Sequence, residues 1–473
     1  MKVLVRARYL FTMDGPGLGV VEDGALYSED GYIVASGPWD EVKGRVSKDD
    51  YYFDFSGYGL VMPGFVDMHM HTGLAIFRGY ACDVPEIKWM SQCLSPLSSA
   101  LDVEAYRLSR LYGVLDGLLS GTIYFGEYGR DIDGFIRYVA EPLGVKVLGA
   151  ELINAVSQPL YEVGDKLYPL DVESGFKQLD IAEEIVKKYS DDPRVKIFFG
   201  PQALDMVPLE VIRKCFELAE EYDTYIHMHV AQGGRERRQI MMRYGDSTVK
   251  ILSREGLLNN RLLAAHMHDA GIEELNLAAS KGVVHIACSR SIANIDGLTP
   301  PLALYTGMGG TSFIGTDQIP CVGNHNMLHE VRFASVLAKL QARDPSRFPP
   351  YKMLRLATVE PLKRLGVIDS GVLREGFKAD YIILDLERIW SRPHSRIYRN
   401  IASVILYSLM GDEVRHVIID GEPKVLDGKP VNINLERLEK EIEETLEEML
   451  ENALYDIERV ECPHYRRYKK NLE

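Results

Sequence analysis

Two histidines separated by one residue are the first feature of this chain that could do chemistry. His69 and His71 stand at the end of the apolar run FVDMHMH. Side chains two residues apart on a β-strand point to the same side, so both imidazoles could reach one ion. Exposed or hydrogen-bonded histidines on a strand would give the same pattern. Only further candidate ligands elsewhere in the chain can therefore favour a metal site.

Further polar side chains end other apolar runs. His227 and His229 lie in YIHMHVAQ, where either could face a common centre by the same alternation; His266 ends LLAAH, and Asp317 ends FIGTD directly before a loop. Neutral imidazoles with one carboxylate suit a divalent metal such as zinc and leave a position open for water. Such an ion would lower the pKa of its water, so that hydroxide could attack an electrophilic carbon while Asp317 takes the proton.

The runs that carry these residues recur along the middle of the chain. Between residues 62 and 365, short runs rich in Val, Ile and Phe alternate with longer amphipathic stretches, which is typical of βα units around a parallel sheet. The candidate strands are GFVDMHMH, GTIYFGEY, VKVLGAE, VKIFFGP, TYIHMHVA, RLLAAHMH, GVVHIA and TSFIGTD. Eight strands make a closed (β/α)8 barrel, and the active site of such a barrel forms at their C-terminal ends.

The two ends of the chain differ from the middle. Residues 1–61 and 366–431 consist of β-like runs between turn signals, among them VLVRARYLFT, DYYFDFSGYGLVMPG, IASVILYS and VRHVIIDG. We therefore expect an α/β fold, with a TIM-like barrel at 62–365 beside a small β-sandwich domain built from both chain ends. Residues 432–473 predict a Glu-rich helical tail that packs on the barrel or on another subunit.

Composition restricts the partners. The 473 residues carry 54 Lys+Arg against 69 Asp+Glu, and the net charge of -15 repels phosphate backbones and anionic membrane surfaces. Neither nucleic acid nor a membrane is expected as a partner. An apolar stretch of about 18 residues is absent, as is a signal-peptide pattern, so a cytoplasmic location is expected. The six cysteines lack CxxC spacing and are interpreted as reduced, mostly structural thiols.

The motif around the first histidine pair has a specific counterpart. The segment VMPGFVDMHMHTGLAIFRGYACDVPEIKWM resembles the opening of the cytosine/adenosine deaminase-like branch of the amidohydrolase superfamily, with its P-G-x-x-D/N-x-H-x-H motif and following R-G. The similarity continues through SGTIYFGE, HMHVAQGGRERRQIMMRYG, LLAAH, GTD and GVLREGFKADYIILD. Within the branch, the chain resembles S-adenosylhomocysteine/methylthioadenosine deaminases and triazine hydrolases.

The resemblance implies one metal site. Its ligands would be His69, His71, His229 and Asp317. Zinc is the divalent ion expected first, with iron, nickel or manganese as alternatives. His266 would hold the metal-bound water or the substrate, which makes His266 and Asp317 the catalytic residues, and His227 would point away. The run IFFGPQ offers no lysine for a second ion. Members of the branch are often dimers or larger, so a homo-oligomer is expected.

Three positions depart from the pattern of the branch. Gln232 stands where its deaminases carry a glutamate that shuttles protons, and an amide cannot exchange protons at useful pH. Gln202 replaces a histidine that contacts substrate, and Ser98 takes the place of a ribose-binding glutamate. These changes count against adenosine-like substrates. The residues expected to contact substrate are Gln232, Gln202, His266, Ser98 and Trp89. Trp89, which follows the first strand, could close over the pocket or could instead pack in the core.

The favoured function is a metal-dependent hydrolase of non-peptide C–N bonds, resembling deaminases and aminohydrolases, that acts through a metal-bound hydroxide on a small nitrogen heterocycle. Two alternatives stay open. A hydrolase could displace another leaving group, such as halide or an alkylamine, from a heteroaromatic ring, which needs less help from protonation when the leaving group is already stable as an anion. A catalytically silent protein could keep the ion and use the pocket to bind a ligand.

Overall fold

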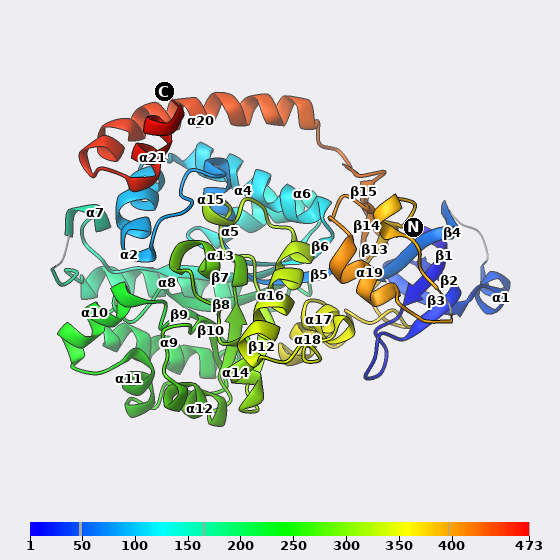
Figure 1. Cartoon of the computed structure of the whole chain (residues 1–473), viewed down its shortest axis with the longest axis horizontal. Helices are drawn as coiled ribbons and strands as arrows, with labels where there is room; N and C mark the ends of the chain where they lie inside the picture. Colours follow the sequence, from blue (N-terminus) through cyan, green and yellow to red (C-terminus); the bar gives the residue numbers. More distant parts are fainter. Residues whose placement is uncertain (47–49, 164–165, 396, 473) are drawn as a thin grey trace.

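Two eight-stranded sheets organise the protein. The computed structural model describes residues 1–46, 50–163, 166–395 and 397–472. In Figure 1, a barrel surrounded by helices lies beside a separate sheet made from the blue and orange ends of the chain, and a long helix near the C-terminus lies above the barrel. The predicted α/β fold with a composite β-domain is confirmed.

The first sheet is the barrel wall. Its parallel strands are β5 (Phe65–Met70), β6 (Thr122–Gly129), β7 (Lys146–Ile153), β8 (Val195–Pro201), β9 (Ile226–Val230), β10 (Leu262–His266), β11 (Val284–Ala287) and β12 (Thr311–Ile314). Each overlaps one of the predicted runs. Nearly every residue in them is buried, because helices cover the outside while side chains fill the inside of a barrel.

The barrel closes between its first and last strands. The amide of His71 donates a hydrogen bond of 2.9 Å to the carbonyl of Asp317, and the amide of Asp317 donates one of 2.9 Å to the carbonyl of His69. Gly315 permits this approach, because a Cβ atom there would lie 2.8 Å from the backbone nitrogen and oxygen of His69. The seam therefore runs through residues predicted as metal ligands.

The helical segments cover the barrel and extend its loops. In chain order those up to the ninth strand are η2 (Thr72–Phe77), α2 (Glu86–Lys88), η3 (Trp89–Leu94), α3 (Ser95–Ser99), α4 (Val103–Leu119), α5 (Ile132–Phe135), η4 (Ile136–Ala140), α6 (Glu141–Leu143), α7 (Leu160–Val163), α8 (Val172–Lys188) and α9 (Leu209–Glu221). The later ones are α10 (Gly234–Tyr244), α11 (Thr248–Arg254), α12 (Ile272–Ser280), α13 (Ser289–Asp296), α14 (Leu302–Gly307), α15 (Ile319–Val322), α16 (Met327–Ala342), α17 (Pro350–Leu356) and α18 (Val359–Arg364).

The second sheet joins both chain ends in the order β16-β15-β14-β13-β4-β1-β2-β3. Its strands are β1 (Lys2–Phe11), β2 (Val20–Glu29), β3 (Tyr32–Pro38), β4 (Tyr51–Pro63), β13 (Tyr381–Asp385), β14 (Val414–Ile419), β15 (Glu422–Leu426) and β16 (Lys429–Pro430). The central strand β4 pairs in parallel with β1 and antiparallel with β13. Two short helical pieces, α1 (Trp39–Val42) and η1 (Lys43–Arg45), follow β3.

One predicted strand is a helix. The run IASVILYS forms α19 (Ile401–Ser408), after the short η5 (Ile389–Ser391). Its β-branched residues favour a strand locally, but Ile401, Val404 and Ile405 are buried at helical spacing where the helix packs against α16 and α17. Tertiary packing has overridden the local preference.

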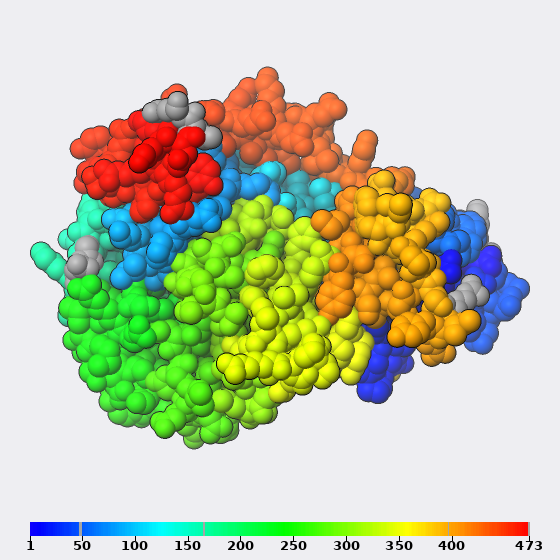
Figure 2. Space-filling view, viewed as in Figure 1, coloured from blue at the N-terminus to red at the C-terminus, as the bar shows by residue number. Residues whose placement is uncertain are grey.

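The predicted C-terminal helix is present and lies on the barrel. It is α20 (Leu435–Arg459), followed by α21 (Pro463–Leu472). The buried residues of α20 are Leu438, Ile442, Met449, Ala453 and Ile457. The helix packs against α3 and α4, and in Figure 2 the red C-terminal helices lie directly over the blue segment that follows the first barrel strand. Among the described residues, no helix is long and apolar enough to cross a membrane.

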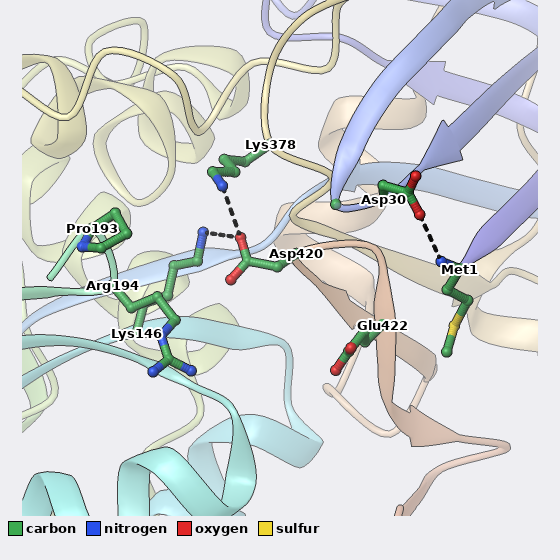
Figure 3. Close-up of a pocket in the computed structure, with 9 residues that line it drawn as sticks. Met1, Asp30, Lys146, Pro193, Arg194, Lys378, Asp420 and Glu422 are labelled. Carbon is green, nitrogen blue, oxygen red and sulfur yellow. Dashed lines mark hydrogen bonds and ion pairs between the residues drawn. The ribbon is translucent and has the colours of Figure 1, made fainter.

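A buried lysine joins the barrel to the composite sheet. Lys146 begins β7, and its Nζ lies 2.6 Å from Asp380 Oδ2 and 2.9 Å from Asp420 Oδ1. Burial alone would lower the pKa of Lys146, but the carboxylates of Asp380 and Asp420, with Tyr124, raise it above its ordinary value. Figure 3 shows Lys146 and Lys378 directed at Asp420 across a cavity of about 430 Å³ between the two domains.

Replacing Lys146 should weaken this junction. In Lys146→Met the two carboxylates lose a buried cation, which we expect to lower the free energy of unfolding by about 3–5 kcal/mol. Urea unfolding measures the change. Lys378→Met is the matched control, because its Nζ lies 3.9 Å from the same Asp420 at a more exposed position and its loss should cost less than about 1 kcal/mol. Equal midpoints for both variants would contradict this account.

Candidate metal centre

Five residues predicted for the site converge at the C-terminal ends of the barrel strands. They are His69, His71, His229, His266 and Asp317. Their potential ligand atoms fall into overlapping groups, His69 with His229 and His266, and His69 with His71 and Asp317, within which all atoms lie inside 4.8 Å. The ring of His69 is central, with its centroid 4.8 Å from that of His71 and 4.9 Å from that of His229. Strands distant in sequence thus supply one cluster.

Hydrogen bonds fix three of these rings. The Nδ1 of His71 lies 2.8 Å from the carbonyl oxygen of Tyr128, and the Nδ1 of His229 lies 2.9 Å from that of Gln202. A carbonyl can only accept, so each Nδ1 carries the proton and each Nε2 keeps a free lone pair. The Nδ1 of His69 lies 2.9 Å from His227 Nε2. His227 belongs to none of the possible ligand groups among the described residues and lies behind His69, on the Nδ1 side of its ring.

The remaining polar atoms of the cluster are placed as ligands of a cation would be. His69 Nε2, Asp317 Oδ1 and both ring nitrogens of His266 are buried without a hydrogen-bond partner in the described part of the chain. Asp317 Oδ1 lies 3.4 Å from His71 Nε2 and 3.7 Å from His69 Nε2. Tetrahedral ligands about 2.1 Å from an ion are about 3.4 Å apart, so these atoms fit around one zinc-sized ion. Unpaired buried polar atoms would otherwise be costly.

The electrostatics of the cluster agree with this fit. Burial, together with neighbouring imidazoles, holds the pKa of His69 and His229 well below the ordinary value, which leaves them neutral as ligands must be. Burial raises the pKa of Asp317, although His71 and a hydrogen bond from Ser291 oppose that shift. Ser291 Oγ donates to Asp317 Oδ2 at 2.5 Å. A cation is the partner that would keep this buried carboxylate ionised.

Asp67 supports the seam from inside the first strand. It accepts hydrogen bonds from the His69 amide at 3.2 Å, the Thr316 amide at 3.1 Å and Thr316 Oγ1 at 2.5 Å. Burial raises its pKa to about 7 despite these bonds. Sequence reasoning assigned it no role, although an aspartate inside an apolar strand was the available signal. Asp67 positions the residues on both sides of the barrel closure.

A cavity of about 850 Å³ opens above the cluster. His71 and His229 form part of its floor, and Gln202, Gln232 and Ser98 line it as predicted for substrate contacts. Gln202 Oε1 accepts a hydrogen bond of 2.5 Å from Asn154 Nδ2. The backbone amide of Gln232 donates to Glu236 Oε2 at 2.7 Å, which fixes the loop after β9.

Trp89 does not join this wall. The residue is fully buried, lies outside the lining of the cavity, and donates its indole N–H to the carbonyl of Ala81 at 2.8 Å. Its environment corresponds to core packing, the second of the two readings of its sequence position. Cys288 was interpreted as structural, yet its Sγ lies within 4.8 Å of ligand atoms of His266 and Asp317.

Comparison with known proteins identifies the family. Residues 60–424 match the amidohydrolase family. The chain belongs to this family. It is 28% identical over 446 residues to a 5-methylthioadenosine/S-adenosylhomocysteine deaminase of Desulforamulus reducens, covering 94% of this chain and 98% of the relative. It is 30% identical over 427 residues to a deaminase of the same name from Nitratidesulfovibrio vulgaris, covering 90% and 93%.

Solved structures show the same fold. An adenosine deaminase from Xanthomonas campestris with bound zinc superposes with a TM-score of 0.85 at 24% identity, covering 94% of this chain and 98% of that one. Atrazine chlorohydrolase from Arthrobacter aurescens, complexed with zinc, gives 0.80 at 20% identity, covering 94% and 100%. The chain therefore shares its family with deaminases, and the predicted class, a hydrolase of C–N bonds other than peptide bonds, agrees with these relatives.

The support of His69 by His227 is testable through metal binding. His227→Leu removes the ring that fixes His69, and loss of such an outer partner should weaken zinc binding 10–100-fold. Competition against a chromogenic chelator measures the affinity. His416→Leu is the matched control, because it removes an equally buried imidazole from the composite sheet and should leave the affinity unchanged. A similar loss in both variants would show a general effect of cavity formation instead.

Proposed function

We propose that this amidohydrolase is a zinc-dependent aminohydrolase that removes an amino group from a small nitrogen heterocycle. The observation that carries the proposal is the convergence of His69, His71, His229 and Asp317 beneath a cavity of about 850 Å³. That volume lies within the range of small-molecule sites. The names of the relatives support the reaction class, since both relatives described above are deaminases. A 5'-deoxyadenosine deaminase of Methanococcoides burtonii is also similar, at 29% identity over 89% of this chain and 91% of its own length.

The residues of the cluster have different roles in the proposed reaction. A divalent ion held by His69, His71, His229 and Asp317 would supply Lewis-acid activation of water. Asp317 can take a proton from that water through Oδ1 and return it to the departing amino group, since the atom faces the cluster and has no hydrogen-bond partner among described residues. His266 has both ring nitrogens available in the same way and can orient the water or polarise the attacked group.

The amides above the cluster would bind the ring. Gln202 and Gln232 both line the cavity, and amide side chains can donate to and accept from the nitrogens of a heterocycle. Ser98 presents only a hydroxyl, which already donates to the carbonyl of Ser95 at 3.0 Å. At these three positions the substrate would meet neutral hydrogen-bonding groups, although Asp102, Arg130 and Asp131 also line the cavity.

Gln232 also favours a second candidate reaction. Its side chain is nearly buried at the cavity wall, and an amide cannot transfer a proton to a ring nitrogen. Displacement of halide from a heteroaromatic ring needs less protonation of the leaving group than loss of ammonia does, because halide is already stable as an anion. A hydrolase of this second type would use the same metal ligands and the same base.

Ammonia release separates these reactions. We expect zinc-loaded protein to release ammonia from one class within a panel of aminopurines, aminopyrimidines, pterins and aminotriazines. Chloro- and alkylamino-substituted rings form the parallel panel, and Gln232→Glu is assayed beside the native chain. Turnover of the second panel alone would establish displacement of another leaving group. Silence of both proteins on both panels, with tight binding of a ring compound, would identify a binding protein.

The role of Asp317 has its own test. Asp317→Asn keeps the shape of the side chain and removes its basicity, so we expect turnover to fall at least about 100-fold while the protein stays folded. Zinc content is measured in parallel, because Asp317 is also a proposed ligand. The matched control is Asp116→Asn, a carboxylate on α4 that receives a hydrogen bond from Arg78. Undiminished turnover in Asp317→Asn would remove Asp317 from the mechanism.

A further inference from the structure

Two cysteines from distant parts of the chain meet beneath the C-terminal helices. Cys93 lies in η3, and Cys462 lies between α20 and α21. Their Sγ atoms are 2.6 Å apart, although 369 positions separate them in sequence. Both side chains are buried, and both are free thiols in the structure. No sequence spacing announces such a pair, because neither cysteine has a neighbour in a recognisable motif.

We propose that Cys93 and Cys462 form a reversible disulfide that fastens the C-terminal helices to the wall of the substrate cavity. Disulfide sulfurs lie about 2.05 Å apart, so the thiols need to approach by only about 0.5 Å. The hydrolase activity proposed above neither uses nor requires this pair.

The thiols can be reached by a small oxidant. Cys93 and Cys462 both line a second cavity of about 610 Å³, which shares no lining residue with the substrate cavity. Leu450 and Leu454 of α20 and Tyr465 and Tyr468 of α21 form part of its wall. A small disulfide would therefore approach the sulfurs from this second cavity and not through the metal centre.

Cys462 is the residue that attacks first. It directly precedes α21, and the contact with Cys93, together with the backbone amides of Tyr465 and His464, lowers its pKa to about 7 in spite of burial. The same contact and burial raise the pKa of Cys93 well above its ordinary value. A thiolate, not a thiol, is the nucleophile in disulfide exchange, and thiolates are stabilised at helix N-termini.

The exchange balances in two steps. The Cys462 thiolate bonds to one sulfur of the small disulfide, whose S–S bond breaks and releases a thiolate, which leaves a mixed disulfide on Cys462. The Cys93 thiol then loses its proton to the released thiolate and attacks the Cys462 sulfur, which expels the second small thiolate. The protein loses two electrons and two protons, and the small disulfide becomes two thiols. A dithiol reductant reverses both steps.

The bond would act on the substrate cavity through η3. Met90 and Leu94 of η3 line that cavity, as do Ser95 and Ser98 of α3. Cys93 lies within the same turn of chain, and α20 packs on α3 while α21 packs on η3. Oxidation therefore joins the tail covalently to the segment that forms one wall, whereas in the reduced protein only noncovalent packing holds the two together.

Peptide mapping tests the bond directly. The full-length, zinc-loaded chain is incubated with oxidised glutathione or with dithiothreitol, alkylated, and digested with trypsin without reduction. We expect residues 89–107 joined to residues 460–466 in the oxidised sample only. Thiols titrated in denaturant should fall from six to four, because two of the six cysteines are consumed. Six remaining thiols, or glutathione attached to Cys462 while Cys93 stays free, would overturn the proposal.

Variants identify the consequence for stability. The oxidised native protein should melt several degrees higher than the reduced protein, because a cross-link restricts the unfolded chain. Cys93→Ser and Cys462→Ser should each abolish this difference. Cys215→Ser is the matched control, since it removes an equally buried cysteine on α9 and should retain both the cross-linked peptides and the shift. Loss of the shift in the control alone would contradict the assignment, and the mapping of the native chain needs no variant.

Discussion

The closure of the barrel between β5 and β12 is the constraint on which the site depends. Two backbone hydrogen bonds, from His71 to Asp317 and from Asp317 to His69, join the first strand to the residues after the last one. The ligand atoms of the first and last strands come together only when this seam is formed. Asp67 reinforces it by accepting from both His69 and Thr316. The fold and the metal centre are therefore completed by the same contacts.

This arrangement buries polar atoms, which costs free energy of folding. Imidazole and carboxylate atoms without hydrogen-bond partners in the described chain meet in the barrel interior, and two of their residues adopt positive φ, with His266 at 77° and Asp317 at 67°. Side chains rarely occupy such backbone conformations unless the surroundings enforce them. In this protein the surrounding barrel enforces these conformations, because the residues are buried and hydrogen bonds hold the His71 and His229 rings. Rigidity around the cluster is the condition for a preorganised ligand set.

Local pattern was sufficient to predict the strands and the histidines at their ends. Alternation with a period of two identified His69 and His71, and each predicted barrel run overlaps an observed strand, because parallel strands buried on both faces leave a strong apolar signal. The helix α19 was missed since its Ile and Val residues favour strands until their partners are known. The role of His227 and the meeting of Cys93 with Cys462 depend on contacts across the fold, which no local window contains.

The composite sheet has a consequence for how the chain is made. Strand β4 needs β13 as its second neighbour, and β13 follows the whole barrel in sequence. While the ribosome is still synthesising the barrel, the edge of β4 that later pairs with β13 is unpaired. An unpaired strand edge can bind other chains. Lys146 also lacks its ion-pair partners during this time, because Asp380 and Asp420 are synthesised much later. The last fifth of synthesis therefore decides whether the first sixty residues reach their sheet or aggregate.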